Sequence, residues 1–264
     1  MDDLIKSFNC DQDRYEYLLF ERDHVLKEAD QILTKYKIEF GKQITELFEI
    51  KIKCIKKKKT IAHYQKALAG DGQVNVSKLE QQLAREMQVY SDQLKAMLAE
   101  NEALKNCVQL TPHESKRIKE LYYVLAKKIH PDLNPSLADD PVIADLWAQI
   151  QTAYIHNDVK KLAELTVQVN KVLKDLDMQG FTDLEIPDIK EKIEELEEEI
   201  HRIKNSAPYT FIEFFKDDAS IKAKHDEIKE QIDNYTKYLE QLQSAIDQML
   251  KNGGITLIWM GNSQ

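Results

Sequence analysis

The chain has 264 residues and a formal net charge of -9, and 42% of its side chains are hydrophobic. The negative charge argues against binding to nucleic acid or anionic membranes, and only 7 Gly and 6 Pro argue against a turn-rich β protein. No stretch approaches the roughly 20 apolar residues of a membrane span, and the first ten residues lack the pattern of a secretory signal. Three widely separated cysteines indicate a reducing environment, and we expect a cytoplasmic protein.

The first expected element is one long helix from about Asp11 to Leu68. Apolar side chains recur along it at every seventh position: Leu19, Leu26, Leu33, Phe40, Leu47, Cys54, Ile61 and Leu68. A sustained seven-residue repeat predicts a helix that packs lengthwise against a partner helix. The lysine run at 56–59 is typical of the solvated side of such a helix.

A return helix follows a turn at residues 69–73, which is rich in glycine. Ser77 and Glu80 form a capping-box pattern at its start, and apolar positions continue to Val108. The two helices predict an antiparallel hairpin over residues 1–110. Since the return helix is shorter, the segment from Tyr15 to Tyr36 lacks an obvious partner within this hairpin.

The central region contains three shorter helices with clear start signals. Thr111, Pro112 and Glu114 cap the first of these helices, and Pro131 predicts that it ends at His130. Asp140 and Pro141 begin the second helix in the same way. Residues 157–158 read as a break and as the cap of a third helix, which runs to about Leu176.

The loop His130-Pro131-Asp132 and its flanking helices resemble the J-domain family. Residues 121–132 stand where that family carries Ala-Tyr-Arg-Lys-Leu-Ala-x-x-Tyr-His-Pro-Asp, and the family pattern Phe-x-x-Ile-x-x-Ala-Tyr is matched by Trp147, Ile150, Ala153 and Tyr154. The resemblance covers about residues 112–158. It implies a co-chaperone or adaptor that recruits a DnaK-type ATPase and stimulates its ATP hydrolysis. It also implies a set of partner-binding residues: His130, Pro131, Asp132, Lys127, Lys128 and Lys119.

The chain departs from the family in two places. Tyr123 and Val124 replace the Arg-Lys pair of the family's second helix. The family's first helix, with its Tyr-x-x-Leu-Gly pattern, is not recognisable, and residues up to Val108 stand in its place as the end of a longer helix. These departures favour the alternative, a non-catalytic coiled-coil scaffold whose J-like helices no longer engage a chaperone.

A second antiparallel hairpin is expected over residues 181–254. Its outgoing helix begins at Pro187, a corner lies at 205–209, and Phe211, Phe214 and Phe215 are expected to plug the hairpin end. The return helix is expected to pack on the segment Tyr15 to Tyr36, and homodimerisation is the competing way to bury that segment. The apolar tail at 255–264 is expected to pack on these helices or on another chain.

The expected fold is therefore all-α, with a J-domain-like unit at 111–180 between two antiparallel coiled-coil hairpins. The hairpins would hold a client protein or organise assembly. The sequence contains no recognisable pairing of a catalytic nucleophile with a general base, no phosphate-binding loop and no cluster with the spacing of metal ligands. We accordingly expect a protein that is not an enzyme, with no cofactor and no metal.

Overall fold

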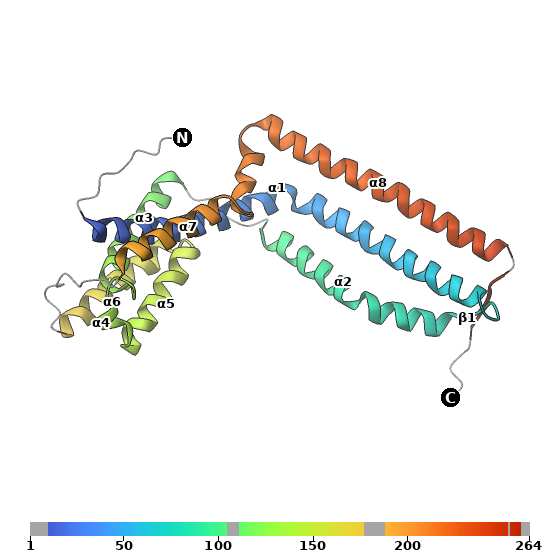
Figure 1. Cartoon of the computed structure of the whole chain (residues 1–264), viewed down its shortest axis with the longest axis horizontal. Helices are drawn as coiled ribbons and strands as arrows, with labels where there is room; N and C mark the ends of the chain where they lie inside the picture. Colours follow the sequence, from blue (N-terminus) through green and yellow to red (C-terminus); the bar gives the residue numbers. More distant parts are fainter. Residues whose placement is uncertain (1–9, 105–110, 177–187, 253, 260–264) are drawn as a thin grey trace. The chain divides into compact units, whose positions relative to one another are not determined.

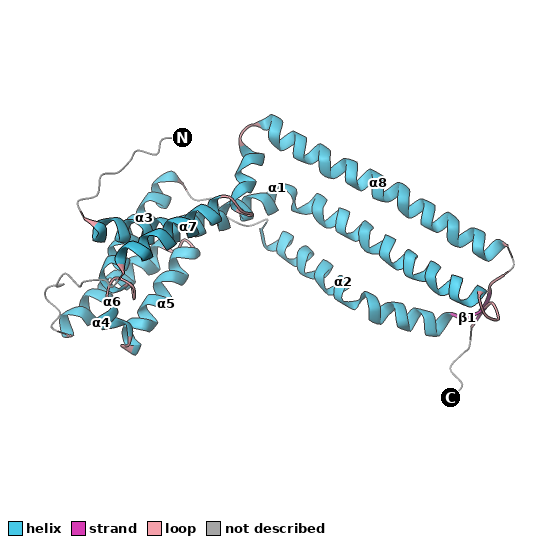
Figure 2. Cartoon of the chain, in the orientation of Figure 1, coloured by secondary structure: helices cyan, strands magenta, loops and turns pink. Residues whose placement is uncertain are grey.

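The computed structural model describes residues 10–104, 111–176, 188–252 and 254–259. Within these ranges α-helices form nearly all of the regular structure, as Figure 2 shows, and the expected all-α class is confirmed. No described helix is both long enough and apolar enough to cross a membrane. The elements, most of which are labelled in Figure 1, are α1 (Asp11–Leu68), β1 (Gln73–Asn75), α2 (Val76–Leu104), α3 (Pro112–Ile129), α4 (Pro135–Ala138), α5 (Pro141–Ile155), α6 (Val159–Asp175), α7 (Ile189–Lys204), the 3-10 helix η1 (Tyr209–Phe215), α8 (Asp218–Lys251) and β2 (Thr256–Ile258).

The chain forms two compact units, each assembled from two separate segments. Unit one comprises Met1–Ile32 and Val108–Thr210, and unit two comprises Leu33–Cys107 and Phe211–Gln264. This division differs from the expected consecutive domains with boundaries at 110, 180 and 254. Helix α1 contributes its first part to unit one and the rest to unit two, while α7 belongs to unit one and α8 to unit two. Helices α7 and α8, which the sequence predicts to form one hairpin over residues 181–254, thus fall in different units.

Unit one has one continuous hydrophobic core. Helices α3, α5 and α6 pack against one another, and the first part of α1 and α7 add side chains to the same cluster. Its fully buried residues include Ile118, Leu125, Ile150, Leu162, Leu165 and Val169. Each of the three central helices has an amphipathic pattern, so each buries one stripe against the other two. This packing fixes the loop between α3 and α5.

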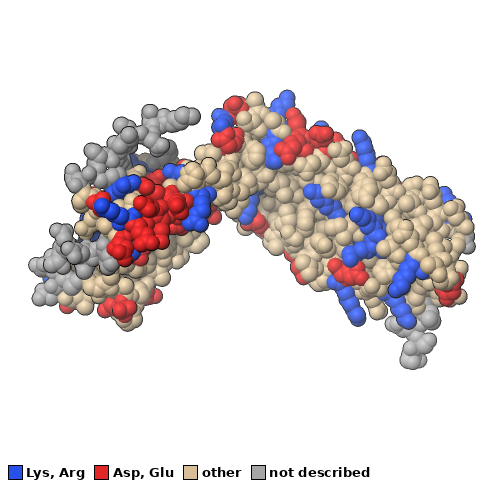
Figure 3. Space-filling model, viewed as in Figure 1, with Lys and Arg blue, Asp and Glu red and all other residues tan. Residues whose placement is uncertain are grey.

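Helix α7 runs parallel to the first part of α1 in unit one. Arg14 Nη2 lies 2.6 Å from Glu197 Oε1, and Lys204 Nζ donates to Glu21 Oε1 at 3.0 Å. The outer face of α7 is rich in glutamates, seen as the red patch on this helix in Figure 3, while Ile193 and Leu196 face the core. The sequence prediction that Pro187 begins this helix lies outside the described residues.

Unit two is built on the second part of α1, which has α2 and α8 beside it (Figure 1). Helix α2 is antiparallel to α1, because Lys37 pairs with Glu100 and Lys59 pairs with Glu86, both at 2.6 Å. These two pairs join the later part of α1 to α2 over residues 37–100. Helix α8, in contrast, runs parallel to α1. Its contacts with α1 advance together along both helices: Glu39 with His225, Lys51 with Tyr235, and Lys57 with Gln243.

An aromatic cluster joins η1 to α1 in unit two. The ring centroids of Tyr36 and Phe211 lie 4.5 Å apart, and those of Phe40 and Phe215 lie 5.8 Å apart. Phe214 adds a further ring beside both Tyr36 and Phe40. These phenylalanines were expected to plug the end of a hairpin between α7 and α8. They pack instead on α1, because η1 leads into a helix that follows α1.

A two-stranded parallel sheet closes the far end of unit two. Strand β1 pairs with β2 in the register Gln73 to Thr256, so residues 256–258 of the apolar tail pair with their own chain, while residues 260–264 of the tail lie outside the described residues. Gly72 has a φ of 73°, and a Cβ there would collide with the carbonyl oxygen of Gly254. Helix α2 begins at Val76, and its backbone at Lys78 donates to the side chain of Asn75 at 2.9 Å. Asn75 therefore replaces the expected Ser77 cap, since the strand brings it directly to the helix start.

Candidate functional site

The helix before the candidate loop begins and ends as its sequence predicts. The Glu114 amide donates to Thr111 Oγ1 at 3.2 Å, and the Thr111 amide donates to Glu114 Oε2 at 2.9 Å, which completes a capping box. Helix α3 ends at Ile129, and His130 has extended backbone angles, with φ -60° and ψ 129°. Pro131 causes this end because its ring disfavours helical geometry at the preceding residue.

A network of hydrogen bonds holds the loop that follows α3. The carbonyl of His130 accepts the amides of Leu133 at 3.1 Å and Asn134 at 2.8 Å. The buried Asn134 side chain donates from Nδ2 to the carbonyls of Lys127 and His130, both at 3.3 Å. These carbonyls belong to the last turn of α3, where helical partners are missing. Asn134 thus ties the loop to the helix end, a role that the sequence alone did not indicate.

His130 lies inside the unit, with only 4% of its surface exposed. Its ring meets Trp147 of α5 edge-on, with ring centroids 4.7 Å apart. Its Nδ1 accepts the backbone amide of Asp132 at 3.0 Å, so the neutral ring carries its proton on Nε2. Burial lowers the pKa of His130, although the nearby Asp132 carboxylate acts in the opposite direction. His130 therefore stabilises the loop conformation from a buried position and does not present its ring to a partner.

Asp132 presents its carboxylate at the surface, with 48% of the side chain exposed. Burial and then the charge of Asp132 raise the pKa of Tyr15 on α1. The pKa of Arg22, also on α1, is raised as well, because Asp23, Glu199 and Asp132 outweigh the effect of burial. The carboxylate of Asp132 consequently lies within electrostatic range of a cation of its own chain.

The three candidate lysines on α3 are in different surroundings. Lys127 is 68% exposed, and its Nζ lies 3.0 Å from Glu16 Oε1 of α1. Lys128 donates to the side chain of Asn170 on α6. Lys119 lies near the middle of α3, with its Nζ 5.5 Å from the centroid of the Tyr123 ring. The structure therefore places Lys127 and Lys128 at the helix end beside the loop, and Lys119 further back along α3.

The first part of α1 lies against α3, a contact that sequence reasoning missed. Tyr122 of α3 donates its hydroxyl to Asp23 Oδ2 at 2.5 Å. Tyr123, one of the two departures from the J-domain pattern, stacks on Phe20 with ring centroids 4.8 Å apart. Residues up to Val108 were expected to stand in for a first J-like helix, and residues 105–108 of that stretch lie outside the described residues. The segment from Tyr15 to Val25 belongs to the same hydrophobic cluster as α3, and no local signal links positions about 100 residues apart.

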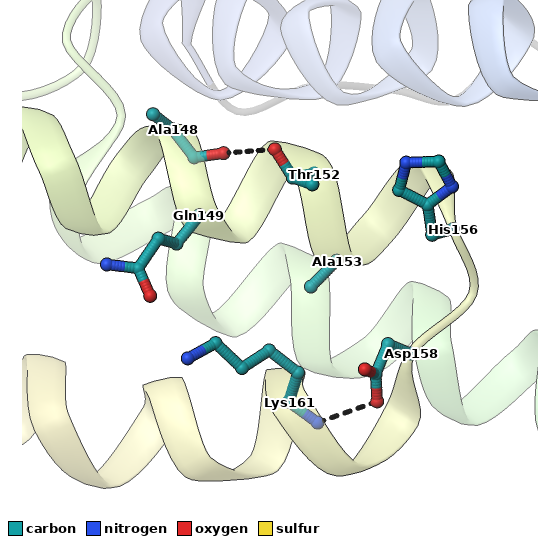
Figure 4. A pocket seen from close by; sticks show the side chains of 7 residues that line it. All are labelled: Ala148, Gln149, Thr152, Ala153, His156, Asp158 and Lys161. Atoms are coloured by element: carbon teal, nitrogen blue, oxygen red, sulfur yellow. Dashed lines mark hydrogen bonds between the residues drawn. The ribbon is translucent and has the colours of Figure 1, made fainter.

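A separate hollow of about 290 Å³ lies between α5 and α6, shown in Figure 4. Several of its polar groups are already bonded within the chain. Asp158 accepts the backbone amide of Lys161 at 2.9 Å as the cap of α6, and Thr152 donates its hydroxyl to the carbonyl of Ala148 at 2.9 Å. These bonds serve the helices, and the hollow is open to solvent around His156. It therefore does not define a site.

No family model, curated protein or solved structure matches this chain.

Proposed function

We propose that unit one is a J-domain-like module that recruits and stimulates a DnaK-type chaperone ATPase through the loop His130-Pro131-Asp132. The long helices of unit two would hold a client protein or organise assembly. In this proposal Asp132 contacts the partner, His130 and Pro131 set the loop geometry, and Lys127 and Lys128 add positive charge beside it. The proposal rests on the sequence resemblance and on the geometry of the loop.

The observation that carries the proposal is an exposed carboxylate on a tightly held loop. Asp132 is half exposed, whereas the neighbouring His130 and Asn134 are buried and hydrogen-bonded. A charge presented by an ordered loop loses little conformational freedom when it binds. A charge-assisted bond from this carboxylate to a partner cation would contribute very roughly 1.5–3 kcal/mol.

The test is single-turnover ATP hydrolysis by the DnaK-type chaperone of the same organism, with the full-length chain added. Wild-type protein is expected to increase the rate, and Asp132→Asn is expected to remove most of the increase. Asp132→Asn is the informative substitution because the side chain is exposed and the backbone bonds of the loop remain. His130→Gln removes the ring that packs on Trp147 and so changes loop shape as well as contact.

The matched control is Asp145→Asn, an exposed carboxylate on α5 of the same unit. It is expected to leave the stimulated rate unchanged. The proposal fails if well-folded wild-type protein gives no stimulation, or if both aspartate substitutions reduce the rate equally.

A second candidate function is a scaffold in which the J-like helices serve only the fold. The contacts between α1 and α3 favour it, because Phe20 covers Tyr123 and Glu16 neutralises Lys127. Under this alternative the chaperone does not bind unit one. Binding measured by calorimetry with the purified chaperone separates the two candidates, since the scaffold predicts no heat of binding and no change with Asp132→Asn.

A further inference from the structure

Unit one contains a cavity that lies apart from the loop and has a buried lysine, Lys27, in its wall. The cavity measures about 360 Å³ and is formed by α1, α3 and α5. Small-molecule sites in proteins have volumes of roughly 300–1,000 Å³, so this cavity falls at the lower end of their range. The lining residues that matter here are Leu26, Lys27, Asp30, Tyr122, Tyr154 and Ile155.

Lys27 is the unusual member of this lining. Only 9% of its surface is exposed, and its Nζ lies 3.7 Å from the centroid of the Tyr154 ring. Within the described part of the chain, no carboxylate forms an ion pair with it. Burial alone lowers its pKa to about 8, so the nearby acids do not compensate the charge. A buried charge without a partner is costly, and an incoming anion would recover that cost.

The two acids that line the same cavity are engaged elsewhere or solvated. Asp23 accepts the hydroxyl of Tyr122 at 2.5 Å and pairs with Arg22 at 2.9 Å. Asp30 is exposed to solvent, where its charge is screened. The ammonium of Lys27 therefore remains the cation available to a ligand inside the cavity.

Apart from Gln151, the rest of the lining is apolar and aromatic. The rings of Tyr122 and Tyr154 stack with centroids 3.9 Å apart and planes 14° apart. Leu26 of α1 and Ile155 of α5 also line the cavity, and about half of each side chain is exposed. A buried cation beside exposed apolar surface matches a ligand that has a charged head and an apolar body.

We propose that this cavity binds a small organic carboxylate, whose carboxylate group pairs with Lys27 and whose apolar body lies against Leu26 and Ile155. The proposal does not depend on a chaperone partner for the loop. The volume suits a compound of the size of benzoate or a short fatty acid. Binding would replace the contact between Lys27 and the Tyr154 ring with a full ion pair.

The test is a titration of the full-length chain with benzoate, followed by NMR of side-chain ¹³C-labelled lysine and by calorimetry. Saturable binding that raises the pKa of Lys27 is expected. The uncharged analogue benzamide is expected to bind about tenfold or more weakly, since it lacks the charge-assisted bond. Lys27→Met should weaken benzoate binding by a similar factor.

The matched control is Lys160→Met, an exposed lysine on α6 of the same unit, which should leave benzoate affinity unchanged. Ile155→Ser provides a second variant at an exposed position and should weaken binding severalfold without disturbing the core. It keeps the test valid if Lys27→Met alters the fold.

The pH dependence of benzoate affinity gives a further readout. Since only protonated Lys27 attracts the carboxylate, affinity should fall above pH 8 toward the roughly tenfold weaker value expected for Lys27→Met. The other titratable groups around Lys27 are Asp23, His24, Asp30, Tyr122 and Tyr154. Burial raises the pKa of both tyrosines and lowers that of His24. None of these three side chains therefore gains or loses a proton in the pH range in which Lys27 titrates.

The proposal is overturned by any of three results. These are an absence of saturable benzoate binding, equal affinity for benzoate and benzamide, and binding that Lys27→Met and Ile155→Ser leave intact.

Discussion

The two units of this chain use the same long helix in different ways. In unit one, α1 joins several short helices around one continuous core, and polar contacts such as Tyr122 with Asp23 set its position. In unit two, α1 lies between long helices, and two separate hydrophobic clusters, rather than one continuous core, are found among its described residues. The apolar stripe of α1 therefore provides a surface for packing, and the neighbouring helices determine whether that surface is buried in one core or in separate clusters.

The largest difference in stability between the two units is expected from a substitution that creates a cavity in the core of unit one. Leu165→Ala empties space around a fully buried side chain and should cost about 3–5 kcal/mol of unfolding free energy. Hydrogen exchange should show lost protection in α3, α5 and α6, with α2 and α8 still protected. Val167→Ala, at an exposed position on the same helix, should change stability by less than about 0.5 kcal/mol. Equal loss of protection in α2 and α8 would mean that the units unfold as one.

A smaller effect, of opposite sign, is expected at Lys27 in unit one. Lys27→Met removes a buried cation and should stabilise the protein at pH 7 by about 2–3 kcal/mol. The pKa of Lys27 is about 8 in the folded chain and 10.5 without burial. Between these values the unfolded chain binds more protons, so the stability of the wild type should rise with pH. Urea denaturation from pH 7 to pH 9, below the range in which tyrosines of the unfolded chain ionise, should show this rise in the wild type and in Lys160→Met, and a nearly flat profile in Lys27→Met.

A third effect tests how unit two is closed at its end. Gly72→Ala places a side chain at a positive φ and against the Gly254 carbonyl, and should cost about 1–3 kcal/mol. Gly70 provides the control, because a Cβ there makes only an ordinary contact, 3.5 Å from the Ala67 carbonyl oxygen. Gly70→Ala should leave the urea midpoint nearly unchanged. Equal midpoints for the two variants would show that the strand pair contributes little to unit two.

The smallest effects on stability are expected from removing exposed ion pairs, and these effects should be of similar size in the two units. Lys37→Ala in unit two and Arg14→Ala in unit one each remove a surface pair. Each loss should be below about 1 kcal/mol and should vanish in 1 M salt because surface charges are screened. Double-mutant cycles with Glu100 and Glu197 measure the two coupling energies. A coupling that persists in high salt would assign one of these pairs a larger role in positioning α1.

The sequence determined the local features of this protein. The capping box at Thr111, the end of α3 before Pro131 and the caps at Asp140 and Asp158 all lie where the residues predict. Each of these features depends on atoms within a few residues of one another, so a single sequence contains the whole interaction. The same holds for the bounds of the long helix α1.

Only the tertiary structure decided the partners and directions of the helices. The apolar stripe of α1 did not specify that α7 and α8 run parallel to it, because a stripe marks a face and does not name the helix that covers it. The burial of His130 under Trp147 and the bond from Tyr122 to Asp23 likewise join segments far apart in the chain. These long-range contacts arise from the fit of several surfaces at once, and they set the exposure of Asp132 and Lys27.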